Sequence, residues 1–397
     1  MTVLDQIRKF PNMILESMQS SKNIRLPLYS FENVVICGAG GSAVVGDLLK
    51  DILKYELRKP IEVSTEYRLP AFVDNKTLAI VISYSGNTEE TLSQFMELRK
   101  VTNKIISISS GGKLETWSKR FRIPHIKVPS GFQPRLATPY MLVPLIAYFG
   151  KIMGKDFDGD VYEGYREIRS LEMRYVEKLA ARIQGKELAV YASNEYAGVV
   201  KAWKNCLNEN SKLPVMWHVL PEMNHNEIVG YQNPDLNKNR VVIFFRDRDE
   251  SPEIRARIDA SEKLMQPNVF GTEEVWAKGV SKISKLLVLV FAGLFLSAML
   301  AELQGIDAER IESIDSLKYE LGQRISTISK LEQNLNRSTI PRWFPSLLSR
   351  LKSRATHREE SERMKPERQV AIQGSLSPKC SQAFLQSCCQ RTRRRPP

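Results

Sequence analysis

Short strand-length segments, several of them unbroken apolar runs, recur through the first 150 residues of this 397-residue chain. They lie at 33–37, 61–65, 78–83, 104–108 and 125–128, and helix-length segments separate most of them. A strand can be apolar on both sides only if both sides are covered, as in a parallel sheet between two layers of helices. The alternation therefore predicts a doubly wound α/β domain, in which ligands bind beyond the carboxyl ends of the strands.

A second series with the same rhythm follows a polar linker around 154–164. We expect helices at 165–183, 196–210 and 252–265 and strands at 188–192, 215–219, 240–245 and 268–270. The chain therefore looks like a tandem repeat of one flavodoxin-like αβα architecture with parallel sheets. We predict an N-terminal domain at 1–153 and a C-terminal domain at 154–322, because a chain of this length can bury two cores.

Residues 286–301 form a run of sixteen almost purely apolar residues. A membrane-spanning helix needs about 20 such residues. The run is slightly short and lies inside the second α/β series, so we expect a buried helix that packs against the second sheet or against a partner subunit. Contact with a membrane is the alternative.

The basic charge of the chain is concentrated at its end. The net charge is +13, and residues 324–397 hold sixteen Lys and Arg and five Asp and Glu, which is +11 of that total. The globular remainder therefore gives no sign of nucleic-acid binding. We expect 323–397 to be a disordered basic extension. The alternative is a tether to nucleic acid or to an anionic surface through Arg391 and Arg393–Arg395.

The cysteines and the N-terminus favour a cytoplasmic protein. Five cysteines are scattered through the chain without the pattern of a disulfide scaffold, and the first ten residues lack the pattern of a signal peptide. Cys37 and Cys206 fall in predicted elements and are expected to be inert packing residues. No spacing typical of a zinc site is present. We expect neither a metal nor a cofactor.

Two loops at predicted strand ends can hold an anion. One is GAGGSA at 38–43, and the other is SYSGNT at 83–88. Each opens a helix, so hydroxyl groups, bare backbone N–H groups and the positive end of the helix can meet one anion. The candidate binding residues are Gly40, Gly41, Ser42, Ser83, Ser85 and Thr88.

The first loop also fits the G-x-G-x-x-A variant of the dinucleotide fingerprint, with Glu66 at a plausible distance for a ribose. A nicotinamide or flavin enzyme is therefore an alternative, as is a tight turn without a ligand. A dinucleotide site does not need the second, hydroxyl-rich loop. Two phosphate-shaped loops in one domain favour a compact phosphorylated ligand.

Six ordered motifs then narrow the class of ligand. They are GAGGSAVVGDLL at 38–49, SYSGNTEETL at 83–92, QPRLATPYML at 133–142, NCLNENSKLP at 205–214, PEMNHNEIVG at 221–230 and IDSLK at 314–318. The first two resemble the sugar isomerase (SIS) domain. Together the six resemble the bifunctional phosphoglucose/phosphomannose isomerases of archaea and some bacteria, over about residues 1–322. The resemblance implies two SIS domains, a homodimer, and interconversion of glucose 6-phosphate and fructose 6-phosphate without a metal.

The resemblance also implies roles for single residues. The glycines and hydroxyls of the two loops would hold the phosphate. Glu209 would move a proton between C1 and C2, and Arg135 would stabilise the enediolate. His225, from the neighbouring subunit, and Lys318 would serve ring opening.

These residue types suit that chemistry. A carboxylate can remove a weakly acidic proton and return it to the next carbon, an arginine stabilises an oxyanion without losing a proton, and a histidine transfers protons near neutral pH. Each residue also has a structural alternative. Glu209 and Lys318 would be solvated helix residues, Arg135 would be a loop ion-pair partner, and His218 and His125 compete with His225.

One segment departs from the family pattern. Members that accept mannose 6-phosphate are expected to carry a threonine a few residues before the lysine, and Ile311 stands at about that position here. The sequence therefore predicts the glucose reaction and leaves the mannose reaction open.

A hypothesis from a different class is a SIS-type regulator that binds a sugar phosphate without turnover. Such regulators usually join a helix-turn-helix domain to one SIS domain. The sequence shows no such domain, and only the basic tail supports this alternative.

Overall fold

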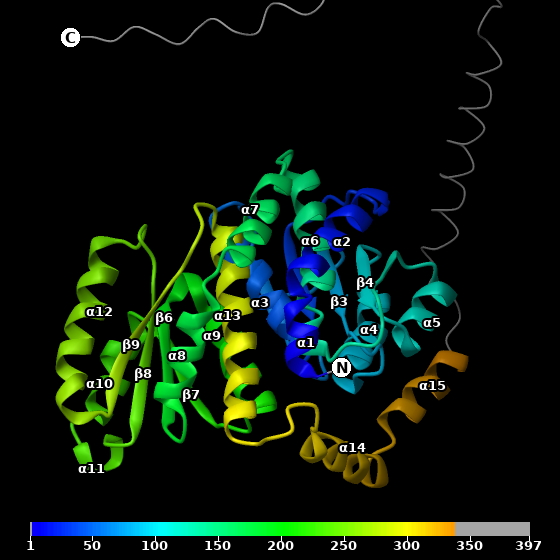
Figure 1. The fold of residues 1–397 in the computed structure, drawn as a ribbon. Coiled ribbons are helices and arrows are strands. Elements are labelled where there is room, and N and C mark those ends of the chain that lie inside the picture. The colour runs from blue at the N-terminus through cyan, green and yellow to red at the C-terminus, as the bar shows by residue number, and fades with distance from the viewer. Residues whose placement is uncertain (1, 338–397) are drawn as a thin grey trace, which may run out of the picture. The chain divides into compact units, whose positions relative to one another are not determined.

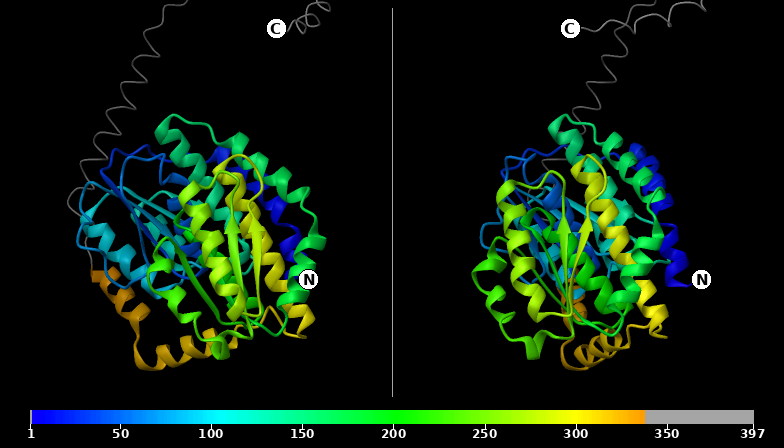
Figure 2. Two further views of the ribbon diagram at one scale, coloured as in Figure 1. Left: turned by 90° about the vertical axis from the view of Figure 1, so that its left-hand side faces the viewer. Right: turned by 60° about the vertical axis from the view of Figure 1, so that its left-hand side comes forward.

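The computed structural model describes residues 2–337. The chain divides into two units, residues 1–341 and 342–397, and the second lies outside the described residues. The first unit holds two parallel sheets, each between layers of helices (Figures 1 and 2). This architecture confirms the predicted doubly wound α/β fold with two sheets.

The strands of the first sheet are β1 (Asn33–Cys37), β2 (Ile61–Ser64), β3 (Thr77–Ile82), β4 (Ile105–Ser109) and β5 (His125–Lys127). They are parallel in the order β2-β1-β3-β4-β5, and each overlaps its predicted position. Every residue of β3 is buried, which explains its unbroken apolar sequence. The chain leaves β1 toward one edge and later continues from β3 toward the other. The carboxyl ends of β1 and β3 therefore form the switch point at which α/β proteins bind ligands.

Two layers of helices cover this sheet. The first layer is α2 (Phe10–Asn23), α3 (Gly41–Leu53) and α6 (Thr138–Met153), preceded by the short α1 (Val3–Arg8), and the second is α4 (Glu89–Val101) and α5 (Gly112–Phe121). Alternate strand residues point into different cores. Ile36 and Ile80 join the cluster of the first layer, whereas Val35 and Val81 join the smaller cluster of the second.

The strands of the second sheet are β6 (Glu187–Ser193), β7 (Val215–Leu220), β8 (Arg240–Arg246) and β9 (Gly271–Trp276), parallel in the order β7-β6-β8-β9. Its helices are α7 (Asp158–Arg169), α8 (Met173–Ile183), α9 (Ala197–Asn210), α10 (Glu227–Gly230), α11 (Pro234–Asn237), α12 (Pro252–Met265) and α13 (Lys282–Leu303). One face packs on α8, α9 and α13, and the other packs on α12 and the α10 region.

Two predicted elements of this domain were wrong. The helix expected at 165–183 is two helices, since α7 packs on α2 and α13 while α8 covers the sheet. No proline or glycine marks the break. The strand expected at 268–270 begins only at Gly271, and its sequence includes the partly exposed Glu273 and Glu274. An edge strand with charged residues does not produce an apolar run.

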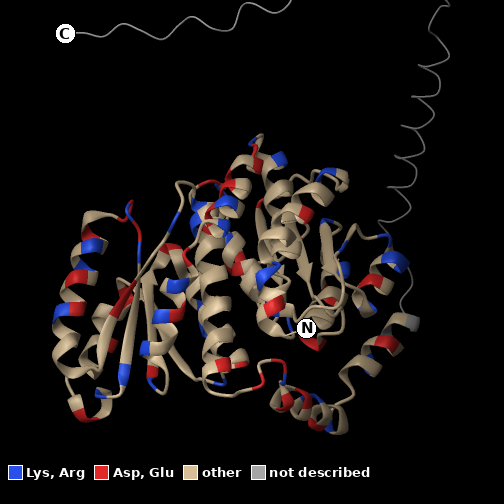
Figure 3. Cartoon of the chain, viewed as in Figure 1, with Lys and Arg blue, Asp and Glu red and all other residues tan. Residues whose placement is uncertain are grey.

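The apolar run at 286–301 forms the middle of α13, which is buried along most of its length and confirms the predicted buried helix. Among the described residues it is the one helix long and apolar enough to cross a membrane. Charged residues lie along α12 and α14 (Glu312–Arg324), but in α13 they occur only near its ends (Figure 3). Its side chains belong to one cluster that also contains core residues of the first sheet. The two domains therefore share a continuous core.

Part of the predicted basic extension is ordered. Residues 323 and 324 end α14, and α15 covers Thr327–Arg337, so the expectation of disorder is wrong for this helix. The helix forms because its apolar residues pack on the first domain. Residues 338–397, with Arg391 and Arg393–Arg395, lie outside the described residues. The boundary at 153/154 stays a prediction.

Helices α3 and α9 lie side by side and join the two domains. A Cβ atom on Gly198 would lie 2.8 Å from the carbonyl carbon of Asp47 and from the backbone nitrogen of Leu48. The Gly198 N–H donates to Asp51 Oδ2 at 2.7 Å, and Lys201 Nζ pairs with Asp47 at 2.9 Å. Glycine at 198 therefore allows the two backbones to touch.

Replacing this glycine tests the contact. In Gly198→Ala, the added methyl must push two backbones apart, so the free energy of unfolding should fall by about 1–3 kcal/mol, as in an overpacked core. Denaturant unfolding followed by circular dichroism measures the change. Gly159→Ala in α7, where nothing lies within 4 Å, is the control and should leave stability unchanged or raise it. Equal stabilities of the two variants would contradict this packing.

Asp51 is a buried acid in the same contact, with 8% of its surface exposed. Burial raises its pKa to about 7, although the Gly198 N–H acts in the opposite direction. Between the ordinary pKa of 3.8 and 7, the unfolded chain has lost a proton that the folded chain keeps. Asp51 therefore lowers folding stability progressively as the pH rises through this window, and the full cost is present above pH 7.

The variant Asp51→Asn keeps an oxygen that accepts the Gly198 N–H and cannot ionise. It should be more stable than the parent above pH 7, and this advantage should shrink as the pH falls toward 4. Denaturant unfolding at several pH values measures the difference. Asp235→Asn on the exposed helix α11 is the control. A stability difference between parent and Asp51→Asn that is constant with pH would show that Asp51 ionises normally.

Candidate active site

Two loops lie at the carboxyl ends of β1 and β3, which are paired neighbours. The β1 loop turns at Gly40, whose φ is +55°, and enters α3. The β3 loop turns at Gly86, whose φ is +71°, and enters α4 through Thr88. Both turns need the left-handed conformation that glycine adopts without strain. Both loops therefore end at helix N-termini, where backbone N–H groups can meet an anion.

The hydroxyl groups of these loops lie at different depths. Ser83 is fully buried, and its Oγ lies 2.9 Å from Thr88 Oγ1. Ser42 is also buried. Ser85 is exposed, and its Oγ accepts the Asn87 N–H at 3.3 Å. The inner hydroxyls therefore shape the turn, and the outer part of the β3 loop is open to a ligand.

Tyr84 connects the two loops to a third segment. Its N–H donates to Ser42 Oγ at 3.2 Å. Its phenol donates to the carbonyl of Pro129 at 2.9 Å and accepts the Phe132 N–H at 3.0 Å. These bonds hold 129–132 beside the loops, directly before the short 3-10 helix η1 (Pro134–Leu136) that carries Arg135.

Arg135 carries a buried cation with three partners. Only 2% of its side chain is exposed. Nη1 lies 2.8 Å from Glu209 Oε2, Nε donates to Asn210 Oδ1 at 2.7 Å, and Nη2 donates to the carbonyl of Ala308 at 2.9 Å. A guanidinium has five N–H groups, so these bonds leave two that can face a developing negative charge.

The β1 loop touches the backbone of Arg135. A Cβ atom on Gly41 would lie 3.0 Å from the Arg135 nitrogen and 3.1 Å from the carbonyl carbon of Pro134. Gly41 therefore permits a close approach between the anion loop and η1. The cation and the loop lie within one packed unit.

Glu209 occupies the last turn of α9, and 24% of its side chain is exposed. Its carboxylate is thus held by Arg135 on one side and reachable on the other.

Burial raises the pKa of the nearby Cys206 thiol to about 12, which makes this thiol inert, as predicted. Lys212 closes the turn after α9, and its Nζ donates to the carbonyl oxygens of Glu209 at 2.6 Å and Asp307 at 3.1 Å. Burial and the charge of Arg135 lower the pKa of Lys212.

The structure brings together most of the predicted site residues but leaves two apart. His225 ends the short helix η3 (Glu222–His225), is exposed, and makes no hydrogen bond to Arg135 or Glu209 within residues 2–337. Lys318 lies on α14 with 70% of its side chain exposed, 3.7 Å from Asp315. One chain therefore brings the two loops, Arg135 and Glu209 together, whereas His225 and Lys318 lie apart from this group.

Four supporting groups escaped the sequence analysis. They are Tyr84, Asn210, Lys212 and the carbonyl of Ala308. Asn210 is fully buried and links Arg135 to Ser297 of α13 through its Nδ2 at 2.8 Å. The first three residues lie inside quoted motifs, but their roles come from contacts between distant segments. Residue type and spacing contain no signal for such contacts.

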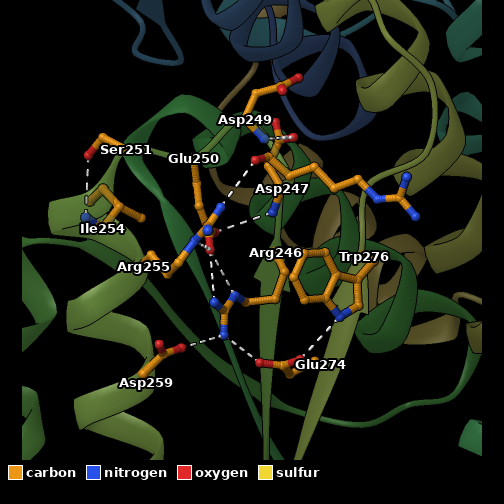
Figure 4. Close-up of polar contacts among 11 residues, drawn as sticks. Arg246, Asp247, Asp249, Glu250, Ser251, Ile254, Arg255, Asp259, Glu274 and Trp276 are labelled. Atoms are coloured by element: carbon orange, nitrogen blue, oxygen red, sulfur yellow. Dashed lines mark hydrogen bonds and ion pairs between the residues drawn. The ribbon is translucent and has the colours of Figure 1, made fainter.

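The second domain has no equivalent anion loop at its corresponding strand end. Strand β8 pairs with β6 as β3 pairs with β1, but it ends in Arg246. Figure 4 shows this guanidinium among the carboxylates of Glu250, Asp259 and Glu274. Glu250 Oε2 also accepts the Asp247 N–H at 3.3 Å. Carboxylates of the same chain therefore already pair with the guanidinium and with a backbone N–H group of this turn.

The fold matches a known domain twice. Residues 28–124 match the SIS domain, and residues 172–321 match the bacterial phospho-glucose isomerase C-terminal SIS domain. A hypothetical protein from Thermus thermophilus has a similar solved structure, with a TM-score of 0.64 and 15% identity over 81% of this chain and 90% of that one. Both halves of the chain therefore have the SIS fold.

Curated relatives give the family. The bifunctional phosphoglucose/phosphomannose isomerase of Caldicellulosiruptor bescii is 32% identical over 81% of this chain and 99% of its own. That of Aquifex aeolicus is 36% identical over 76% of this chain and 93% of its own. A D-glucosamine-6-phosphate 4-epimerase of Sulfolobus acidocaldarius is 31% identical over 55% of this chain and 70% of its own. The chain belongs to the bifunctional phosphoglucose/phosphomannose isomerase family.

Proposed function

We propose that this protein interconverts glucose 6-phosphate and fructose 6-phosphate through a cis-enediol. The observation that carries the proposal is the 2.8 Å contact of Arg135 with Glu209, beside two hydroxyl-rich loops at a sheet switch point. Two relatives that this chain matches over nearly their whole length are named as phosphoglucose/phosphomannose isomerases. A base, a cation and an anion site are the three parts that the reaction needs.

The two loops would bind the phosphate end of the sugar. Gly40 and Gly41 allow close approach of the backbone. The hydroxyl groups of Ser42, Ser83, Ser85 and Thr88 line the turn and would position phosphate oxygens, directly or through each other. The N-termini of α3 and α4 add positive ends. These groups hold the substrate and perform no proton transfer.

Glu209 would act as the base. Its carboxylate would take the proton from C2 of the open-chain aldose and return it to C1, while a proton moves between the two oxygens. The charge that develops on these oxygens would face Arg135, which stays protonated throughout. The bond from Arg135 Nη1 also fixes the direction of the carboxylate. No metal or cofactor enters this scheme, and the assay should proceed in EDTA.

Ring opening needs proton transfer at the ring oxygen and at the C1 hydroxyl. We assign it to His225 and Lys318 in a homodimer. Both side chains are exposed in the single chain, so a neighbouring subunit can meet them. In this assignment His225 reaches the active site of the partner. We also propose a cytoplasmic location, in keeping with the free buried thiols of Cys37 and Cys206.

Removing the base tests the reaction. Glu209→Gln keeps the size of the side chain and an acceptor for Arg135, but it cannot take a proton. Conversion of fructose 6-phosphate should fall by about 10²–10⁴-fold, while calorimetry should still detect binding of fructose 6-phosphate. A coupled assay with EDTA measures turnover, and glucosamine 6-phosphate is tested alongside because one relative is named for its epimerisation. Parental turnover in Glu209→Gln would overturn the assignment.

Ile311 tests the choice of epimer. It is the N-cap of α14 and offers no hydroxyl group. In Ile311→Thr, the ratio of mannose 6-phosphate to glucose 6-phosphate turnover should rise by roughly tenfold, the effect of about 1.4 kcal/mol in the transition state. Ile311→Val has nearly the shape of threonine and is the matched control. If both variants change the ratio equally, shape rather than the hydroxyl determines the preference.

A further inference from the structure

Helix α15 lies beyond the residues that match the family and packs on the first domain (Figure 1). It contacts α4, the helix that begins at Thr88 of the β3 loop. Leu335 is 4% exposed and belongs to the smaller core cluster, and Ile328 and Leu331 pack against the same cluster. The apolar side of α15 therefore continues the layer that covers the first sheet.

Polar contacts join α15 to α5. Glu332 forms an ion pair with Lys113 in the first turn of α5. Arg120, near the other end of α5, donates through Nη2 to the carbonyl of Leu335 at 3.2 Å. The ion pair is about two-fifths exposed, and exposed ion pairs contribute little to stability. The apolar contacts therefore dock the helix, and the polar contacts orient it along α5.

The same turn of α5 binds the anion loop. The backbone N–H of Lys113 donates to Asn87 Oδ1 at 3.0 Å, and the N–H of Leu114 donates to the carbonyl of Gly86 at 2.9 Å. The first N–H groups of a helix have no partner within the helix. Here the β3 loop supplies two of these partners, so two hydrogen bonds join the N-terminus of α5 to the loop.

The loop and the helix pack closely against each other. A Cβ atom on Gly86 would lie 1.9 Å from the carbonyl oxygen of Gly111, and one on Gly112 would lie 2.3 Å from the carbonyl oxygen of Ser85. Backbone lies directly against backbone at both points. A displacement of α5 must therefore displace Ser85 and Gly86 as well.

We propose that α15 is a strap that positions the phosphate-binding loop at 83–88 through α5, with Lys113 and Asn87 as the positioning residues. The proposal rests on the proposed function, because it assigns this loop to the phosphate of the substrate. Undocking of α15 frees Lys113 on one side and loosens the turn that holds Asn87 and Gly86. The loop then binds an anion less tightly, while Arg135 and Glu209 keep their contact.

A substitution in the full-length chain tests the strap. Leu335→Asp places a charge in the apolar contact and should undock α15, which hydrogen exchange of 327–337 detects. We expect the KM for fructose 6-phosphate and the Kd for inorganic phosphate to rise together by roughly 3- to 10-fold, well below the ~100-fold loss from misplacing reacting groups. We expect kcat to change less than twofold. Leu264→Asp, the same change at an exposed leucine of α12, should alter neither constant.

A charge exchange gives a second measurement that leaves the apolar contact of α15 unchanged. Lys113→Glu and Glu332→Lys should each raise the Kd for inorganic phosphate, and the double variant should restore it. The strap is overturned if the Kd and KM stay at parental values while 327–337 exchanges freely, or if kcat falls without a change in KM. An inactive parent that binds phosphate would overturn the proposed function and leave the strap testable by calorimetry. A parent that does not bind phosphate would overturn both.

Discussion

The contact of α3 with α9 determines the geometry of the candidate site. Helix α3 begins at the β1 loop, and α9 runs back beside it from Gly198 to Glu209. Because helices are stiff and rise about 1.5 Å per residue, their contact sets the distance between the β1 loop and Glu209. In the proposed function, the substrate would lie between two domains whose separation depends on a glycine. Arg135 closes the other end of this arrangement.

The sequence analysis succeeded where one local rule determines the outcome. Buried parallel strands produce apolar runs, and the turns that follow β1 and β3 contain glycine, so the strands and the positions of these two turns were found. It failed at β9, where an edge strand carries Glu273 and Glu274, and at α15, whose helix depends on contacts with α4 and α5. The pairing of Arg135 with Glu209 joins segments 74 residues apart. Resemblance to a family suggested these two residues, but periodicity and composition contain no information about such a contact.

The two domains show how one topology can serve two purposes. Strands β3 and β8 hold equivalent places, yet the first ends in a loop of small hydroxyl residues and the second in a network of charged residues around Arg246. In the second domain, the carboxylate of Glu250 pairs with Arg246 and accepts the Asp247 N–H. The first turn leaves the hydroxyl group of Ser85 exposed, and the proposed function assigns this turn to the phosphate of the substrate. The second domain instead contributes Glu209, Asn210 and the Ala308 carbonyl around Arg135.

Helix α13 has a consequence for the order in which the protein can be made. It is apolar on all sides and packs on helices of both domains, including α1, α3, α7 and α9. All strands of both sheets precede α13 in the chain, so a ribosome completes this helix only after it has synthesised both sheets. Until then, the apolar surfaces of the first domain that α13 covers remain exposed to water. Exposed apolar surface favours aggregation, so the newly made chain is most prone to aggregate before α13 is complete.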